Sequence, residues 1–184
     1  MMNTEPQKTP PTPNPIKEGI LIKNAGLVLL NSYWPLLFER LEFTKDKHWI
    51  NGELQLQAVQ YLQYVATGLA HTAAELLPLN KLLCGLPLSA STPDQVTVTA
   101  SQQVLIEGLL KAVIAYWPAI GSTSIDAFRG NWLVRDGLLL QKEERWELTV
   151  EKRAYDLLIH RSPFSFSLIK YPWMDRPLQV NWGY

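Results

Sequence analysis

Apolar side chains recur at helical spacing through the first two thirds of the chain. The segment 25–41, AGLVLLNSYWPLLFERL, carries apolar residues on one helical face, and Pro35 is expected to kink or restart this helix. Segments 52–67 and 72–84 give two further helical patterns, the first of them amphipathic with glutamines on its polar face. The short apolar run 20–22 could form a strand. The pattern therefore predicts a mainly helical N-terminal region.

The most apolar segment begins after a helix-starting signal. Thr99 and Gln102 have the spacing of a capping box, in which two side chains satisfy free amides at the start of a helix. The run 104–117, VLIEGLLKAVIAYW, is apolar almost all round. The polar positions form only a thin strip: Gln103, Glu107 and Lys111. We therefore expect the central, most buried helix here, and a further helix over 124–134 with Ser124 as its N-cap.

In the last quarter of the chain the hydrophobic period changes to two. Alternation over 138–141 and 146–150, with the polar turn KEER between them, predicts a β-hairpin. Alternation recurs at 164–168 and 178–182, after a short helix expected at 154–160. Helices first and strands last predict an α+β fold, with an N-terminal helical bundle of about five helices followed by a small antiparallel C-terminal β-sheet.

Composition divides the chain into two parts. Residues 1–16 contain five of the 13 prolines and almost no large apolar side chains, which predicts a disordered, proline-rich tail. Apolar residues make up 47% of the whole chain, which is enough to form a core. We therefore expect residues 17–184 to form a single α+β domain.

Charge and cysteine content narrow the classes of partner. The 17 basic and 17 acidic residues give a formal net charge of zero, which argues against nucleic acid or an anionic membrane surface as the main partner. A single cysteine excludes an internal disulfide and fits a reducing compartment. No apolar run approaches the ~20 residues that cross a bilayer, and the N-terminus lacks the apolar core of a secretion signal. These features predict no membrane span and a cytoplasmic location.

The cysteine lies in the segment 79–87, LNKLLCGLP, where a reactive site must be weighed against a helix end. Lys81 could favour a thiolate at Cys84 and make the chain a cysteine-dependent enzyme. Gly85, however, is a natural helix C-cap, and the dipole at a helix C-terminus disfavours a thiolate. Burial is also the usual fate of a free cysteine. We therefore interpret Cys84 as a packing residue.

No other pattern indicates catalysis or a bound cofactor. The three histidines do not form a metal-binding pattern: His48, His71 and His160. A dyad of His71 with Cys84 is conceivable, but no spacing supports it. The segments GLPLSAST and GSTSIDAF lack the lysine and spacing of a phosphate-binding loop. The sequence therefore predicts no enzyme activity, no cofactor, no metal site and no small-molecule substrate.

Six of the seven tryptophans fall into two groups. Those within apolar patterns are expected in the core: Trp34, Trp117, Trp132 and Trp146. Trp173 and Trp182 lie in the C-terminal segment YPWMDRPLQVNWGY, where proline limits regular strand pairing. Aromatic residues near a terminus serve either as lids on the core or as contact anchors for a partner. Both alternatives stay open for these two residues, which are candidate partner contacts.

Six phrases, taken in order, resemble one known family. They are NAGLVLL with WPLLFERL, AVQYLQYVATG, LNKLLCGLPL, LLKAVIAYWPAIGSTSIDAFRGNWLVRDG, WELTVEKRAYDLLI, and YPWM with LQVNW. Together they cover nearly all of residues 17–184 and are similar to the conserved domain of the tape measure proteins of contractile injection systems. These systems are phage-tail-like particles with a contractile sheath around an inner tube. The resemblance implies a single tape-measure-like α+β domain.

The resemblance also implies a function and a set of partners. It implies a non-enzymatic structural or assembly component, related to the protein that sets the length of tube and sheath, in the cytoplasm or within the assembled particle. The implied partners are tube, baseplate or terminator proteins, and further copies of the chain as a homo-oligomer. Lys81 becomes a candidate partner contact beside Trp173 and Trp182. The alternative is an assembly chaperone or adaptor for a tape measure or cargo protein.

Chain length limits whether this chain alone could measure the length of a tube. A single helix of the whole chain would extend only roughly 270 Å, and a compact domain of this size has a radius of gyration of about 16 Å. We therefore expect this chain to be a short paralogue of the length-measuring protein, an excised domain of it, or the part that anchors or caps it.

Overall fold

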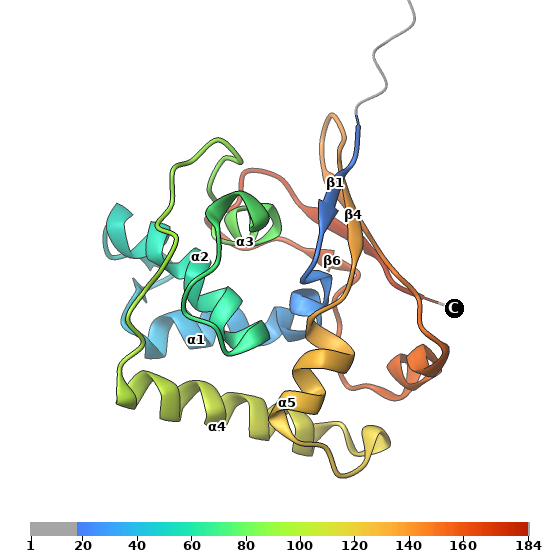
Figure 1. Ribbon diagram of the computed structural model, residues 1–184. Helices are drawn as coiled ribbons and strands as arrows, with labels where there is room; N and C mark the ends of the chain where they lie inside the picture. The colour runs from blue at the N-terminus through green and yellow to red at the C-terminus, as the bar shows by residue number, and fades with distance from the viewer. Residues whose placement is uncertain (1–17, 184) are drawn as a thin grey trace, which may run out of the picture.

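A computed structural model describes residues 18–183 (Figure 1). The predicted proline-rich tail, residues 1–16, lies outside the described residues. The strands are β1 (Ile20–Ile22), β2 (Thr44–Lys45), β3 (His48–Trp49), β4 (Gly137–Gln141), β5 (Trp146–Val150), β6 (Leu168–Ile169) and β7 (Leu178–Asn181). The α-helices are α1 (Trp34–Arg40), α2 (Gly52–Thr67), α3 (Pro78–Leu83), α4 (Ala100–Tyr116) and α5 (Ile125–Phe128). The 3-10 elements are η1 (Ala25–Tyr33), η2 (Ala74–Leu76), η3 (Pro118–Ile120) and η5 (Ala154–Arg161), and η4 (Arg129–Leu133) is π-helical.

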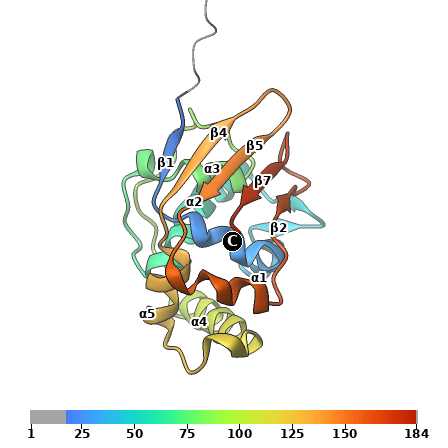
Figure 2. The same ribbon diagram turned by 90° about the vertical axis from the view of Figure 1, so that its right-hand side faces the viewer.

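Five strands form one mixed sheet in the order β1-β4-β5-β7-β6. β4 and β5 make the predicted hairpin, and β1 pairs antiparallel with the outer side of β4. β7 runs parallel to β5, and β6 pairs antiparallel with β7. Strands β2 and β3 form a separate small hairpin. Figure 2 shows β1, β4, β5 and β7 side by side, with α2 and α3 behind them and α4 and α5 below.

The predicted layout of an N-terminal bundle followed by an antiparallel C-terminal sheet is wrong. Strand β1, at the N-terminal end of the described chain, is part of the sheet, and the β5–β7 pairing is parallel. Helical and strand segments are therefore interspersed along the chain. A run of three apolar residues is too short to show a period of two, and its partner β4 is more than a hundred residues away. η5 lies between β5 and β7 in the chain, and a crossover of this kind allows parallel pairing.

The helix boundaries follow the predicted start signals closely. Pro35 occupies the first turn of α1, so it restarts the helix after η1. Thr99 and Gln102 form the expected capping box, and Ser124 Oγ accepts from the amide of Ala127 at 3.1 Å. The helix predicted over 72–84 is wrong in its first half, because the residue before a proline avoids helical geometry and α3 begins only at Pro78.

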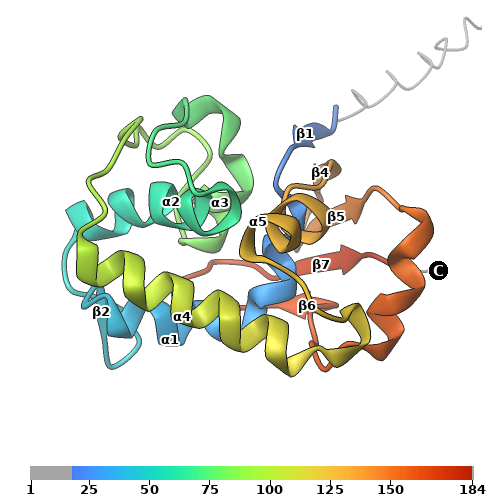
Figure 3. The same cartoon turned by 60° about the horizontal axis from the view of Figure 1, so that its bottom comes forward.

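The core lies between the helices and the sheet (Figures 1 and 3). Its centre is the start of η1, where Ala25 and residues 27–30 are all 0–1% exposed. Gly26 is required at this point because a Cβ atom would collide with the backbone carbonyl of Trp132 in η4. Packing in the core therefore holds η1, the first helical element, against η4, the last helical turn before β4.

Helix α4 is peripheral, so the prediction that it is the central, most buried helix is wrong (Figure 3). Only three of its side chains are buried: Ile106, Leu110 and Val113. In contrast, Val104 is 70% and Tyr116 is 63% exposed. Glycine and alanine count as apolar in a sequence pattern but bury little area, so the helix looked more core-like than it is. A largely apolar face of α4 is therefore exposed to solvent.

Candidate functional site

A buried set of amide side chains joins the first helical segment to α2 and α3. Asn24 is buried, and its Nδ2 donates to Gln63 Oε1 and Asn80 Oδ1, at 2.7 Å each. Asn80 Nδ2 donates in turn to the carbonyl oxygen of Val59 at 2.9 Å. Buried polar groups are tolerated when they find such partners. The asparagines of the phrases NAGLVLL and LNKLLCGLP therefore hold three segments together.

Gly85 and Trp173 bring the C-terminal segment against the end of α3. Gly85 has φ +75°, and a Cβ atom there would collide with the backbone carbonyl of Trp173. Trp173 Nε1 donates to the carbonyl oxygen of Leu83 at 2.9 Å, which satisfies an acceptor that the helix end leaves free. The indole also packs against Phe38 and Trp49, at centroid distances of 6.0 and 5.2 Å. Trp173 is half-buried, so the lid arrangement predicted as one alternative is present on this side of the core.

Cys84 and Lys81 both lie inside the fold. Cys84 is fully buried, and burial raises the pKa of its thiol well above the ordinary value. Since the thiolate is the nucleophilic form, this supports the packing role inferred from the sequence. Lys81 is 7% exposed, and its Nζ donates to the carbonyl oxygen of Leu88 at 3.3 Å. The predicted partner contact of Lys81 stays a prediction.

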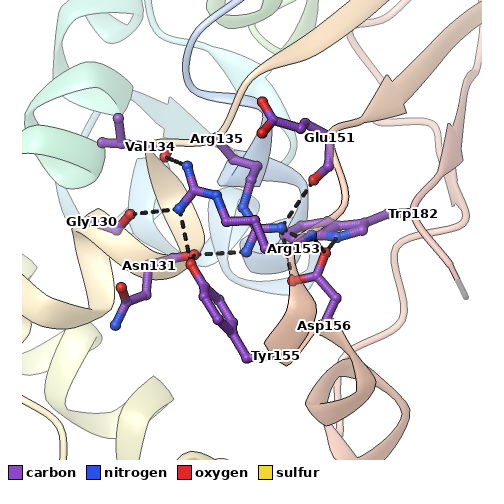
Figure 4. Close-up of polar contacts among 9 residues, drawn as sticks. All are labelled: Gly130, Asn131, Val134, Arg135, Glu151, Arg153, Tyr155, Asp156 and Trp182. Atoms are coloured by element: carbon purple, nitrogen blue, oxygen red, sulfur yellow. Dashed lines mark hydrogen bonds and ion pairs between the residues drawn. The ribbon is translucent and has the colours of Figure 1, made fainter.

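A buried ion pair links the segment after η4 to η5 (Figure 4). Arg135 Nη1 lies 2.8 and 2.7 Å from the two carboxylate oxygens of Asp156, and the two side chains are 0% and 3% exposed. Arg135 also donates to the carbonyl oxygens of Asn131 and Glu151, at 2.8 and 3.1 Å. A charge pair can be buried only when its remaining hydrogen-bonding capacity is largely met, as it is here.

Aromatic rings enclose this ion pair. The Arg135 guanidinium lies 5.5, 5.5 and 5.0 Å from the centroids of three rings: Trp132, Tyr155 and Trp182. Trp182 Nε1 donates to Asp156 Oδ2 at 3.0 Å, and the backbone amide of Arg153 donates to the same oxygen at 3.0 Å. Trp182 is 6% exposed, which matches the core-lid alternative. Its predicted contact with a partner stays a prediction.

The lowered pKa of Asp156 is consistent with a structural ion pair between the segment after η4 and η5. Burial alone would raise the pKa of Asp156, but hydrogen bonds from Arg135, Trp182 and the backbone outweigh burial and hold that pKa below its usual value. The carboxylate is therefore ionised and enclosed. Sequence reasoning missed both charged residues. The available signal was a charge inside an apolar phrase: Arg135 follows WLV, and Asp156 precedes LLI.

The other groups considered from the sequence show no shared site. His48 Nδ1 lies 2.8 Å from the carbonyl oxygen of Asp46, and His71 forms an isolated bridge with Gln95. Within residues 18–183, no group of three or more His, Cys, Asp or Glu side chains is arranged to hold a metal ion. The described helices also include none that is long and apolar enough to cross a membrane.

An open apolar groove lies between α1 and α4. Its volume is about 420 Å³. Residues from η1 and α1 form one wall, and residues from α4 form the other: Tyr33, Leu36, Leu37 and Arg40 against Val104, Leu105, Gly108, Leu109 and Ala112. Arg40 is the only charged residue of the lining. A surface of this kind binds another apolar surface more readily than a polar small molecule.

Comparison with known proteins identifies a family that the chain matches. A family model described as contractile injection system tape measure protein matches residues 2–182, nearly the whole chain. No curated protein and no solved structure matches the chain.

Proposed function

The chain belongs to the contractile injection system tape measure protein family, and from this premise we propose that it is a non-enzymatic structural component of particle assembly. It acts by docking on tube, baseplate or terminator proteins rather than by catalysis. Its place of action is the cytoplasm during assembly and the assembled particle afterwards.

One observation supports a structural role beyond the family match. The phrases that carry the resemblance meet in buried contacts. Asn24 and Asn80 join NAGLVLL to LNKLLCGLP, and Trp173 of YPWM caps the helix of LNKLLCGLP. Arg135 of NWLVRDG pairs with Asp156 of the phrase WELTVEKRAYDLLI. Residues in the phrases that carry the resemblance thus connect segments that are distant in sequence, which supports a role as a folded docking subunit.

The proposed docking does not use buried atoms directly. Lys81, Trp173 and Trp182 make internal hydrogen bonds, so we propose that they act on a partner through the surface that they support. Trp173 is half-buried and packs against Trp49, next to the 52% exposed side chain of Ile50. This neighbourhood is the most direct candidate for a contact that involves Trp173.

Affinity purification of the tagged chain from its own host, with mass spectrometry of the bound proteins, tests the proposal. Recovery of tube, sheath or baseplate subunits would support a component of the particle. Recovery of one tape measure or cargo protein without particle subunits would favour the assembly chaperone or adaptor. Recovery of no particle protein, with normal particles formed in its absence, would refute both functions.

A further inference from the structure

The outward face of α4 has the composition of a protein interface. A row of residues spaced four apart runs along the exposed side of the helix: Ala100, Val104, Gly108, Ala112 and Tyr116. Residues four apart lie above one another on a helix, so these five form one continuous ridge. The exposed fractions of Val104 and Tyr116, 70% and 63%, are large for apolar side chains.

Gly108 lies at the centre of this ridge and allows close approach. Among residues 18–183, a Cβ atom at this position would meet no atom within 4 Å, so no contact within that part of the chain requires glycine. Glycine in a helix interior is destabilising relative to alanine. The groove between α1 and α4 opens beside it and adds the 45% exposed side chain of Leu36 to the apolar surface.

We propose that this face binds a second copy of the chain, with the two α4 helices antiparallel about a two-fold axis at Gly108. Such an arrangement places residues at equal distances from Gly108 opposite each other. Val104 then faces Ala112 of the second copy, and Tyr116 faces Ala100, so each larger side chain meets a smaller one. The ridge is therefore complementary to itself in the antiparallel direction.

The charges beside the ridge have the same self-complementarity. Glu107 and Lys111 are exposed on one flank of the ridge, and neither forms an ion pair inside residues 18–183. A two-fold axis at Gly108 brings the same flank of both helices together. Glu107 then lies only about 3 Å along the axis from Lys111 of the second copy, at 1.5 Å per residue. Each glutamate thus gains a lysine partner across the interface.

The inference deepens the proposed function by naming a partner and a surface, but it does not depend on that function. The oligomeric state is measured on the isolated chain, whereas the proposed function is measured on particles. A dimer that is absent from particles, and whose deletion leaves the particles normal, would leave this inference standing and refute the function. A monomer that is found in particles would do the reverse.

A cysteine at the two-fold axis gives the sharpest test. Cys84 is fully buried, so Gly108→Cys introduces an accessible thiol without competition from it. Facing helices packed about 8–10 Å apart bring these two Cα atoms to about 4–5 Å, close to the geometry of a disulfide. The matched control is Gln103→Cys, an exposed position of α4 whose two copies would lie about 15 Å apart along the axis.

We expect mild oxidation to convert Gly108→Cys, but not Gln103→Cys, to a covalent dimer. Sedimentation of the unmodified chain should give a dimer at about 100 µM, where a micromolar contact is saturated. A monomeric mass at that concentration, or equal cross-linking of both variants, would overturn the proposal. The same oxidation in a host-cell lysate offers the chain other partners, and cross-linking of Gly108→Cys to a different particle protein there would also overturn the proposal, because the face would then belong to that partner.

Charge exchange tests the register independently. Glu107→Lys places four lysines together in the dimer, and Lys111→Glu places four glutamates together. We expect each single change to raise the dissociation constant of the dimer about tenfold. Each change removes the two exposed Glu107–Lys111 pairs across the interface and replaces them with repulsion between like charges. The double variant with both changes should return to within about threefold of the original. Single and double variants that dimerise equally well would contradict the antiparallel register.

Discussion

Removal of the buried Arg135 guanidinium should destabilise the fold strongly. Arg135→Met keeps an apolar side chain of similar length but leaves the Asp156 carboxylate buried without its partner. Breaking a buried pair in this way costs about 3–5 kcal/mol of unfolding free energy. This is a large part of the about 5–15 kcal/mol that stabilises an ordinary domain. For a chain of this size, the melting temperature should fall by about 6–20 °C.

A solvent-exposed ion pair provides the matched control. Lys23 and Asp136 lie 3.3 Å apart, but their side chains are 69% and 53% exposed. Exposed pairs contribute about 0–1 kcal/mol, so Lys23→Met should change the unfolding free energy by less than ~1 kcal/mol. Denaturant unfolding followed by tryptophan fluorescence measures both variants under the same conditions. A loss for Arg135→Met no larger than that for Lys23→Met would refute the structural role of the buried pair.

The double variant Arg135→Met with Asp156→Leu separates the pair from its surroundings. It removes the unpaired charge, so we expect it to regain about half of the loss caused by Arg135→Met alone. Full recovery is not expected, because the Trp182 indole and the carbonyl oxygen of Asn131 lose their partners. Strictly additive losses would contradict direct coupling between the two residues.

The same pair predicts a pH dependence. The pKa of Asp156 is lowered in the fold, so its stabilising contribution is present above the unfolded pKa of about 3.9 and is lost as pH falls through the lower folded pKa. Without Arg135, burial should instead raise this pKa above the unfolded value. The stability deficit of Arg135→Met should therefore shrink as pH falls from about 7 to about 4. A deficit that is constant over this range would contradict the electrostatic explanation.

Three further experiments test individual contacts. Gly26→Ala should lower the unfolding free energy by at least ~2 kcal/mol because the new Cβ meets backbone, whereas Gly130→Ala, with no atom within 4 Å, should change it by less than ~1 kcal/mol in denaturant titrations. Cys84 should react with iodoacetamide at pH 8 only as fast as the chain unfolds, as followed by mass spectrometry, and rapid labelling of the native chain would contradict its burial. Trp173→Phe should lose about 1 kcal/mol in thermal unfolding, because the carbonyl oxygen of Leu83 loses its donor, and an unchanged melting temperature would refute this cap.

Local signals in the sequence predicted local structure well. The capping pair Thr99 and Gln102, the N-cap Ser124 and the helix restart at Pro35 are all present in the fold. Each of these features depends on contacts between residues only a few positions apart, so the local sequence is enough to predict it. The family resemblance was also confirmed, because it rests on six phrases in order rather than on any one of them.

Non-local pairing could not be predicted in the same way. Nothing in the run 20–22 indicates that it pairs with β4, and nothing in the alternation of β7 indicates a parallel partner. The ion pair of Arg135 with Asp156 joins residues 21 positions apart in sequence. Each residue adjoins a run of apolar residues, and nothing in either run indicates the other as its partner. The exposure of α4 depends on what packs against it, which hydrophobicity alone does not specify.

The most direct test of the proposed structural role is a comparison of injection particles from host cells with and without the chain. Electron microscopy would give the number and length distribution of the particles, and mass spectrometry would give their protein content. We predict that the chain is present in purified particles and that its deletion abolishes them or changes their length distribution. Particles of normal number and length without the chain, together with its absence from normal particles, would contradict the proposed role.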